Sequence, residues 1–256
     1  MTETAAQNAK ATTAYTPGAF VWHECYTKDI ASSKKFYEEL FGWRIEKSPM
    51  PDMDYYLVYV GDKQVAGMFQ PEHVMNYWQG YVSVTDVDAA AKAAGANGAK
   101  VMMEPTDIPH IGRFSAIQDP QGAVFSLYKS ANGDPDGEAM PAPGEPCWDS
   151  LNTSDVSAAA AFYQKVVGWT FEANEGGGVF KAGDLMEASV DEAQGGTPPS
   201  WLMHVFVKDL AEARAKAEKL GAKTLMAEID TGEWGKFGVI QDPNGAVLSL
   251  FQPKEG

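Results

Sequence analysis

Cysteine is scarce in this chain. Only Cys25 and Cys147 occur among 256 residues, and they form no CxxC pair. Two cysteines are too few for a disulfide framework, so we expect free, buried thiols. Long apolar runs are also missing, because no stretch approaches the roughly 18 consecutive apolar residues of a membrane span. Residues 1–16 are polar and lack the apolar centre of a signal peptide, so the expected location is cytoplasmic.

Basic residues are the minority among the charged ones. The chain holds 20 Lys and Arg against 35 Asp and Glu, a formal net charge of -15. This negative field repels phosphate backbones and anionic headgroups, and no local basic patch offsets it. We therefore expect neither nucleic acid nor a membrane surface as a partner. Common catalytic signatures are missing as well: the sequence has no P-loop, GxGxxG, GxSxG or HExxH.

The sequence repeats itself after about half its length. Residues 113–130 align with residues 236–253 at ten identities in eighteen positions, with an offset of 123. A second set recurs with an offset of 126 and includes Trp22 and Trp148. Repeats of this kind indicate tandem domains. We expect a disordered tail at 1–16, a first domain at 17–130, a Gly- and Pro-rich linker at 131–144 and a second domain at 145–253.

Each copy contains two cycles of one strand, one helix and three strands. In the first cycle, Phe20–Thr27 has the aromatic and β-branched content of a strand, and Asp29 is placed to cap a helix at Ile30–Phe41. Gly42 is the expected end of that helix. The prediction is an α+β fold in which four βαβββ units form two tandem domains packed as a pseudo-dimer, because such packing covers apolar faces and sheet edges. The caps expected for the later helices are Asp86, Asp155 and Asp209.

Short motifs recur at fixed places in these units. A D-x6-F-Y motif begins at Asp29 and is followed by Gly42 and Trp43, and a D-P-x-G-A motif spans residues 119–123. With this order of units, the chain resembles the vicinal oxygen chelate superfamily, which includes glyoxalase I, bleomycin- and fosfomycin-resistance proteins and extradiol dioxygenases. It is similar in detail to two-domain glyoxalase-like proteins whose first strand reads W-x-E, as it does from Trp22. The resemblance implies the fold more strongly than any one reaction.

The resemblance also implies a divalent metal held by His or Glu from the first, fourth, fifth and eighth strands. The fourth-strand segments, 66–68 and 188–190, hold no usual metal ligand. Counting from the shared motifs places Trp22 and Trp148 at the first-strand position, Gln79 and Leu202 at the fifth, and Ser126 and Ser249 at the eighth. These groups lack the charge and lone pairs that a divalent ion needs. We therefore expect no metal and no cofactor.

Residues two apart along a strand point to the same face of the sheet, so each position named above indicates further residues on the same face. The resemblance implies cups that join the first half of one domain to the second half of the other. On that arrangement, cup one contains Trp22, Glu24, Tyr26, His204 and Ser249, whereas cup two contains Trp148, Ser150, Asn152, Gln79, Tyr81 and Ser126. Glu24 and His204 are the candidate catalytic residues, because an acid and an imidazole together suit proton transfer. The others are candidate ligand-binding residues.

Each candidate also has a structural interpretation. Trp22 and Trp148 can pack the floor of the barrel, Glu24 can form a buried salt bridge with Lys or Arg, and His204 can be a hydrogen-bonded core residue. His23 and Asp149 share a position on the opposite strand face and are expected to be structural. Four methionines are expected in the core, namely Met102, Met103, Met203 and Met226.

Three functions fit these residues. The first is binding of a small aromatic or apolar metabolite in one cup without the family metal. The second is a metal-independent lyase or isomerase, or a hydrolase, with Glu24 as general base. The third is a glyoxalase- or dioxygenase-like metalloenzyme with relocated ligands such as Glu24 and His204. We rank binding first, and we expect a compact monomer or small homo-oligomer with a small molecule as its partner.

Overall fold

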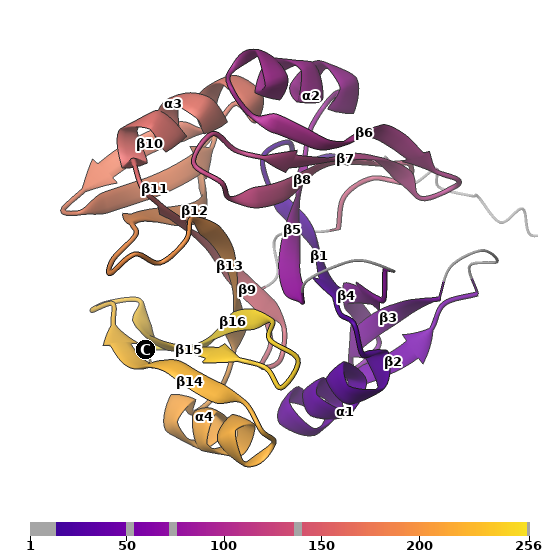
Figure 1. The fold of residues 1–256 in the computed structure, drawn as a ribbon, viewed down its shortest axis with the longest axis vertical. Helices are drawn as coiled ribbons and strands as arrows, with labels where there is room; N and C mark the ends of the chain where they lie inside the picture. Colours follow the sequence, from indigo (N-terminus) through magenta and orange to yellow (C-terminus); the bar gives the residue numbers. More distant parts are fainter. Residues whose placement is uncertain (1–13, 50–53, 72–75, 136–139, 255–256) are drawn as a thin grey trace, which may run out of the picture.

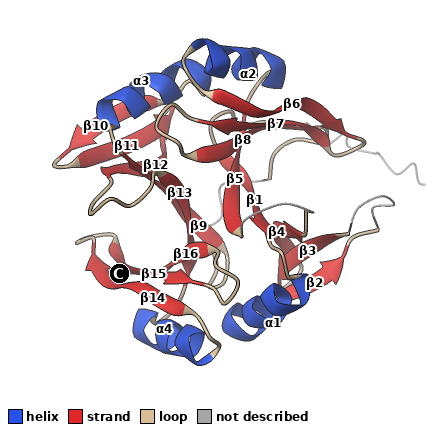
Figure 2. Cartoon of the chain, in the orientation of Figure 1, coloured by secondary structure: helices blue, strands red, loops and turns tan. Residues whose placement is uncertain are grey.

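The computed structural model describes residues 14–49, 54–71, 76–135 and 140–254, and within them the chain forms four helices and sixteen strands. The first domain contains β1 (Phe20–Tyr26), α1 (Ile30–Phe41), β2 (Arg44–Lys47), β3 (Tyr55–Val60), β4 (Lys63–Phe69), β5 (Tyr77–Ser83), α2 (Val87–Ala96), β6 (Lys100–Ile108), β7 (Gly112–Gln118) and β8 (Val124–Ser130). The second contains β9 (Pro146–Thr153), α3 (Val156–Val166), β10 (Thr170–Asn174), β11 (Gly177–Ala182), β12 (Leu185–Glu192), β13 (Ser200–Phe206), α4 (Leu210–Lys219), β14 (Lys223–Asp230), β15 (Gly235–Gln241) and β16 (Val247–Pro253). The prediction of four βαβββ units in an α+β fold is confirmed (Figure 2).

Local sequence signals set the ends of the helices. The side chain of Asp29 accepts a hydrogen bond from the Ser32 backbone N–H at 2.9 Å, which satisfies one free donor at the start of α1. The three other helices begin with aspartate in the same role. Gly42 ends α1 at φ 72, a left-handed conformation that a residue with a Cβ adopts at a cost.

Each domain forms one eight-stranded mixed sheet. In the first domain the strand order is β2-β3-β4-β1-β5-β8-β7-β6, and the second domain repeats it as β10-β11-β12-β9-β13-β16-β15-β14. The two central strands, β1 and β5, are antiparallel, and Trp22 lies opposite Tyr81 in their register. The two βαβββ units of one domain are therefore joined by hydrogen bonds into a single sheet.

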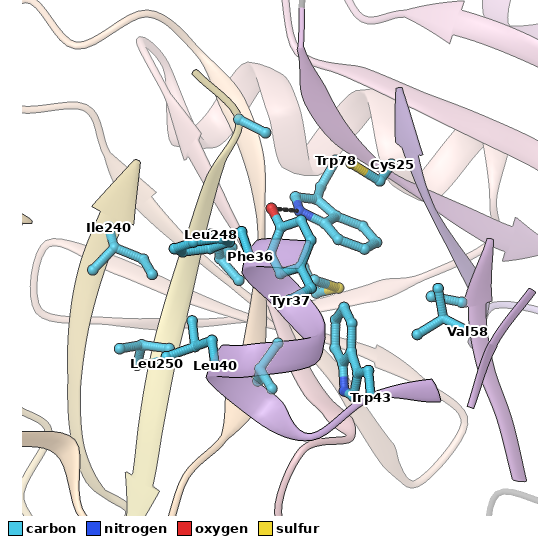
Figure 3. Close-up of a cluster of buried hydrophobic side chains, with 14 of the residues drawn as sticks. Cys25, Phe36, Tyr37, Leu40, Trp43, Val58, Trp78, Ile240, Leu248 and Leu250 are labelled. Carbon is cyan, nitrogen blue, oxygen red and sulfur yellow. Dashed lines mark hydrogen bonds between the residues drawn. The ribbon is translucent and has the colours of Figure 1, made fainter. Parts of the chain in front are cut away.

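The two sheets lie back to back and curve in opposite directions, with α1 beside α4 at one end and α2 beside α3 at the other (Figure 1). Each end holds a hydrophobic core shared by the domains. One core packs Tyr37 and Trp43 from the first domain with Ile240 and Leu250 from the second, and within it the Trp78 indole N–H donates to the Tyr37 hydroxyl at 2.8 Å (Figure 3). The pseudo-dimer prediction is confirmed by these shared cores.

The repeated Gly-Trp motif anchors the chain where it enters each domain. The Trp43 indole N–H donates to the Gly144 carbonyl at 2.7 Å, and Trp169 donates to the Gly18 carbonyl at 2.9 Å. Residues 14–16 of the expected tail are also held, since the Thr16 N–H donates to Asp134 at 2.8 Å. Residues 1–13 of the expected tail and 136–139 of the expected linker lie outside the described residues. None of the helices described is long and apolar enough to cross a membrane.

Candidate functional site

The concave face of each sheet forms a cup (Figure 1), and strand alternation directs into each cup the side chains of one domain. This corrects the predicted grouping, in which Glu24 and His204 shared a cup. The reason is the pairing of β1 with β5 of its own domain, which places Glu24 opposite Gln79. The exchange of halves between domains occurs in the hydrophobic cores behind the sheets, not in the cups. The first cup holds Trp22, Glu24, Tyr26, Gln79 and Tyr81 with Ser126, and the second holds Trp148, Ser150, Asn152 and His204 with Ser249. Residues of both cups line one large hollow of the molecule.

Glu24 lies at the floor of the first cup with 7% of its surface exposed. The Tyr81 hydroxyl donates to Glu24 Oε2 at 2.5 Å, and the hydroxyls of Tyr26 and Tyr81 are 3.2 Å apart. Burial raises the pKa of Glu24, while hydrogen bonds from Tyr81, Tyr55 and Tyr26 oppose that shift. Every group that lowers this pKa is a tyrosine rather than a cation, which argues against the alternative of a structural salt bridge.

Tyr55 belongs to this site, although its position in the sequence gave no sign of it. Its hydroxyl accepts a hydrogen bond from the Trp22 indole at 3.1 Å and contributes to the environment of Glu24. The space for it comes from Gly67, because a Cβ on that residue would lie 1.8 Å from the Tyr55 hydroxyl. In the second domain the corresponding indole, Trp148, donates to Ser189 at 3.2 Å instead.

Aromatic rings form much of the wall of the first cup. Tyr26 stacks on Tyr77 with centroids 4.6 Å apart and an interplanar angle of 6°, and it contacts Phe69 at 4.7 Å. Tyr81 lies near Phe114, with ring centroids 6.1 Å apart. Planar, apolar surface of this kind favours a ligand that can stack.

Gln79 and Ser126 take a different role from the rest of the first cup. The Gln79 amide donates to the Ser126 hydroxyl at 2.5 Å, and the two residues are 1% and 0% exposed. Each side chain therefore has a buried partner. The two residues are brought to the predicted place, and their assignment to ligand binding stays a prediction.

His204 and Ser150 form the polar floor of the second cup. Ser150 Oγ lies 2.8 Å from His204 Nε2, and the imidazole is 3% exposed. Burial lowers the pKa of His204 to about 3, so the ring is neutral at physiological pH. Its edge contacts Phe237, with ring centroids 5.2 Å apart. The pairing observed is with a serine hydroxyl, and the predicted acid–imidazole pair with Glu24 does not form.

Of the other residues predicted for the second cup, two line the hollow and one is buried in the sheet. Trp148 and Asn152 line the hollow. Ser249 is fully buried, and its hydroxyl donates to the Gly238 carbonyl at 3.3 Å. On the opposite face of the strands, His23 Nε2 lies 3.0 Å from Asp149, where both side chains are buried between the domains. This hydrogen-bonded pair fits the structural assignment made for both residues.

Comparison with known proteins agrees with this architecture. The model of the Glyoxalase/Bleomycin resistance protein/Dioxygenase superfamily matches residues 19–127, and a Glyoxalase-like domain model matches residues 147–251. The chain belongs to this superfamily. The resemblance inferred from the motifs is thereby confirmed.

Relatives of this superfamily member cover nearly the whole chain. "Putative glyoxylase CFP32" of Mycobacterium tuberculosis is 32% identical over 252 residues, covering 93% of this chain and 96% of that protein. The anthracycline biosynthesis protein DnrV of Streptomyces peucetius is 29% identical over 269 residues, covering 95% and 96%. The Mn(II)-bound glyoxalase from Novosphingobium aromaticivorans superposes with a TM-score of 0.64 at 16% identity, covering 95% of this chain and 84% of that one, and shows the shared fold.

The superfamily's metal does not fit the residues present here. At the centre of the first cup stand Trp22, Gly67, Gln79 and Ser126, and the second cup has Trp148, Ser189, Leu202 and Ser249. Among the residues that the structure describes, no three His, Cys, Asp or Glu side chains gather as a metal site would require. The relocated pair considered above, Glu24 with His204, is divided between two cups.

Proposed function

We propose that the first cup binds a small, planar and mostly apolar molecule, without the family metal, through a hydrogen-bond donor or positive charge offered to Glu24. The observation that carries this proposal is a buried carboxyl group that faces an aromatic cup and is surrounded by tyrosine hydroxyls rather than cations. Burying a carboxylate without a cation is costly. A ligand that brings a positive charge or a further hydrogen-bond donor to Glu24 offsets part of that cost and is bound more tightly for it.

The outer wall of the cup supports an apolar ligand. Met102 and Met103 on β6 line the hollow and are 50% and 46% exposed. The expectation that they are core residues is wrong, as it is for Met226, which is 47% exposed, whereas Met203 is buried. Flexible thioether side chains at a cavity wall adapt to ligands of different outline.

Similarity to relatives supports the scaffold and leaves the ligand open. One relative is named as a glyoxylase and another for anthracycline biosynthesis, so the names alone point to different roles. Since one fold hosts many chemistries, the residues of the cup define the ligand class better than the names of relatives do.

The experiment is a calorimetric titration with three naphthalene probes of similar size. They are 2-naphthylmethylamine, which is cationic, 2-naphthol, which is a neutral donor, and 2-naphthoate, which is anionic. We expect affinity to fall in that order, and we expect Glu24→Gln to weaken the amine by about tenfold or more, as for a lost charged hydrogen bond. Ser150→Ala, the equivalent position in the other cup, is the matched control. Tighter binding of 2-naphthoate, or an unchanged amine affinity in Glu24→Gln, would contradict the proposal.

A second candidate function is proton transfer by Glu24 on the bound molecule. It is favoured by the raised pKa of the carboxyl group and by the Tyr81 hydroxyl held at 2.5 Å from it. A carboxyl group held by a hydroxyl in this way is placed to pass a proton to and from a bound molecule. Deuterium uptake from D2O at carbon C1 of 2-naphthol, faster than in buffer alone and lost in Glu24→Gln, would favour this function. Binding without exchange would favour the first.

A further inference from the structure

We propose that the second cup is a separate ligand site for an uncharged aromatic or apolar carbonyl compound, whose oxygen accepts a hydrogen bond from the Ser150 hydroxyl. This inference does not depend on the ligand proposed for the first cup. It rests on the equivalence of two residue pairs, on the tautomer that the environment of His204 selects, and on the apolar wall of the second domain.

The polar floors of the two cups occupy the same positions of the repeat. Glu24 and Tyr81 of the first domain correspond to Ser150 and His204 of the second, at the offsets of 126 and 123. Both pairs are hydrogen-bonded across the two central strands, at 2.5 Å and 2.8 Å. The second domain thus keeps the arrangement and replaces a carboxyl group by a hydroxyl and a phenol by an imidazole. The acid of the first cup has no equivalent at this position.

The unpaired ring nitrogen of His204 decides the direction of its hydrogen bond. Nδ1 is buried and has no hydrogen-bond partner among the described residues. If Nδ1 carried the proton, a buried N–H would lack an acceptor, and such orphaned donors are rare and costly. With the proton on Nε2, His204 donates to Ser150 Oγ at 2.8 Å. The Ser150 proton is then free to point into the cup as a donor.

The same geometry argues against Ser150 as a nucleophile. A serine activated by histidine needs a basic imidazole and a third group that orients it. His204 Nδ1 has no such group, and burial lowers the pKa of the ring to about 3. An imidazole in this state holds the serine in place rather than removing its proton. The pair is therefore suited to binding.

The wall of the second cup favours an apolar, uncharged ligand. Leu225 and Met226 on β14 line the hollow and are 52% and 47% exposed, and they correspond in the repeat to Met102 and Met103. Trp234, also lining the hollow, is 58% exposed, and Phe237 packs on the edge of His204. The floor formed by Ser150 and His204 is uncharged, and the carboxyl groups of Asp191 and Glu192 on β12, which also line the hollow, disfavour an anionic ligand.

The test uses 2-acetylnaphthalene as an acceptor-only probe of the second cup. We expect saturable binding that Ser150→Ala weakens about fivefold, as for one lost neutral hydrogen bond, and that Glu24→Gln leaves unchanged. Saturating 2-naphthylmethylamine should not displace it. Equal affinity in Ser150→Ala, displacement by the amine, or no saturable binding to the wild-type protein would overturn the proposal. Failure of the amine titration alone would overturn only the function proposed for the first cup.

A nitrogen-15 NMR spectrum of the histidine rings tests the donor assignment without any ligand. We expect the His204 ring to remain neutral from pH 8 to pH 5, with its proton on Nε2, and the spectrum of His204→Gln to identify the signals. A proton on Nδ1, or a charged ring at pH 5, would overturn the assignment of Ser150 as the donor.

Discussion

The hydroxyl of Tyr37 in α1 donates a hydrogen bond to Asp242 of the other domain at 2.8 Å, and Tyr163 in α3 donates in the same way to Asp119 at 2.9 Å. Each tyrosine belongs to the repeated F-Y motif and each aspartate to the repeated D-P-x-G-A turn. The aspartates also accept backbone N–H groups of their own turns, for example from Gly122 at 2.7 Å. The two motifs that are most similar between the copies are therefore partners across the domain interface.

Removal of one interface hydroxyl should destabilise the whole chain. Tyr37→Phe leaves Oδ2 of the buried Asp242 carboxyl and the Trp78 indole N–H without their partner, while Asp242 Oδ1 keeps its backbone donors, so we expect a loss of about 1–3 kcal/mol in the free energy of unfolding. Urea unfolding measures it, and Tyr163→Phe should cost a similar amount. The control is Tyr56→Phe, since the Tyr56 hydroxyl has no hydrogen bond in the described structure. Equal stability of Tyr37→Phe and Tyr56→Phe would show that the contact is not structural.

Glu187 should make stability depend on pH. Burial and then the charge of Asp149 raise the pKa of this β12 residue to about 7 from 4.5. Because the folded-state pKa is the higher one, the folded protein binds the proton more tightly, and this contribution is lost as pH rises through about 7. We expect Glu187→Gln to gain about 1–2 kcal/mol at pH 8 and almost nothing at pH 4. Exposed Glu39→Gln is the control, and a gain independent of pH would refute this assignment.

The buried His23–Asp149 pair between the domains should matter for stability and not for binding. His23 Nε2 lies 3.0 Å from Asp149, with their side chains 8% and 6% exposed. Asp149→Asn removes the charge and should lower the free energy of unfolding by about 2 kcal/mol. Binding of the amine and ketone probes should be unchanged in this variant. A loss of probe affinity at undiminished stability would assign the pair to a ligand site instead.

Gly67 should control the shape of the first cup. In Gly67→Ala the new Cβ conflicts with the Tyr55 hydroxyl at 1.8 Å, so that ring must leave Trp22 and Glu24. We expect several-fold weaker binding of 2-naphthylmethylamine with little change in melting temperature, because the ring end is movable. Ser189→Ala, the counterpart in the second domain, should leave amine binding intact. If Gly67→Ala binds the amine normally, Tyr55 is not part of the site.

Metal analysis checks the proposal that the cups act without the family metal. After incubation with Mn2+ or Zn2+ and dialysis, we expect far less than one equivalent to remain, because indole, amide and hydroxyl groups occupy the central positions. Mass spectrometry of the digested protein measures the content. One tightly held equivalent that disappears in Glu24→Ala would instead indicate a relocated metal site.

Local signals in the sequence were sufficient for the units of this fold. Capping aspartates, Gly42 and the turn at residues 119–122 act within a few positions, so α1 was predicted with its observed bounds, Ile30–Phe41. Strand alternation also placed Trp22 and Glu24 on one face. These features depend on neighbouring residues alone.

The composition of each cup depended on long-range pairing that the sequence left open. Strand β1 could pair with β5 of its own domain or with a strand in the second half of the other domain, and both arrangements bury similar apolar faces. Alternation therefore predicted the face on which Glu24 lies, but it could not predict which residues surround Glu24. Met102 was misassigned because an edge strand lining a hollow has the same apolar residues as a core strand. Tyr55 was missed because the gap it fills is created by Gly67, a residue twelve positions away.

The separation of the cups from the hydrophobic cores determines which amino-acid substitutions affect one domain and which affect both. Each cup is closed within one domain, while each core needs helices and strands of both. A substitution that retunes one cup therefore leaves the other cup and the interdomain surface untouched, whereas a substitution in a core is felt by both halves. The two copies accordingly differ at one repeat position, Glu24 and Ser150 in the cups, and are identical at another, Tyr37 and Tyr163 at the interface.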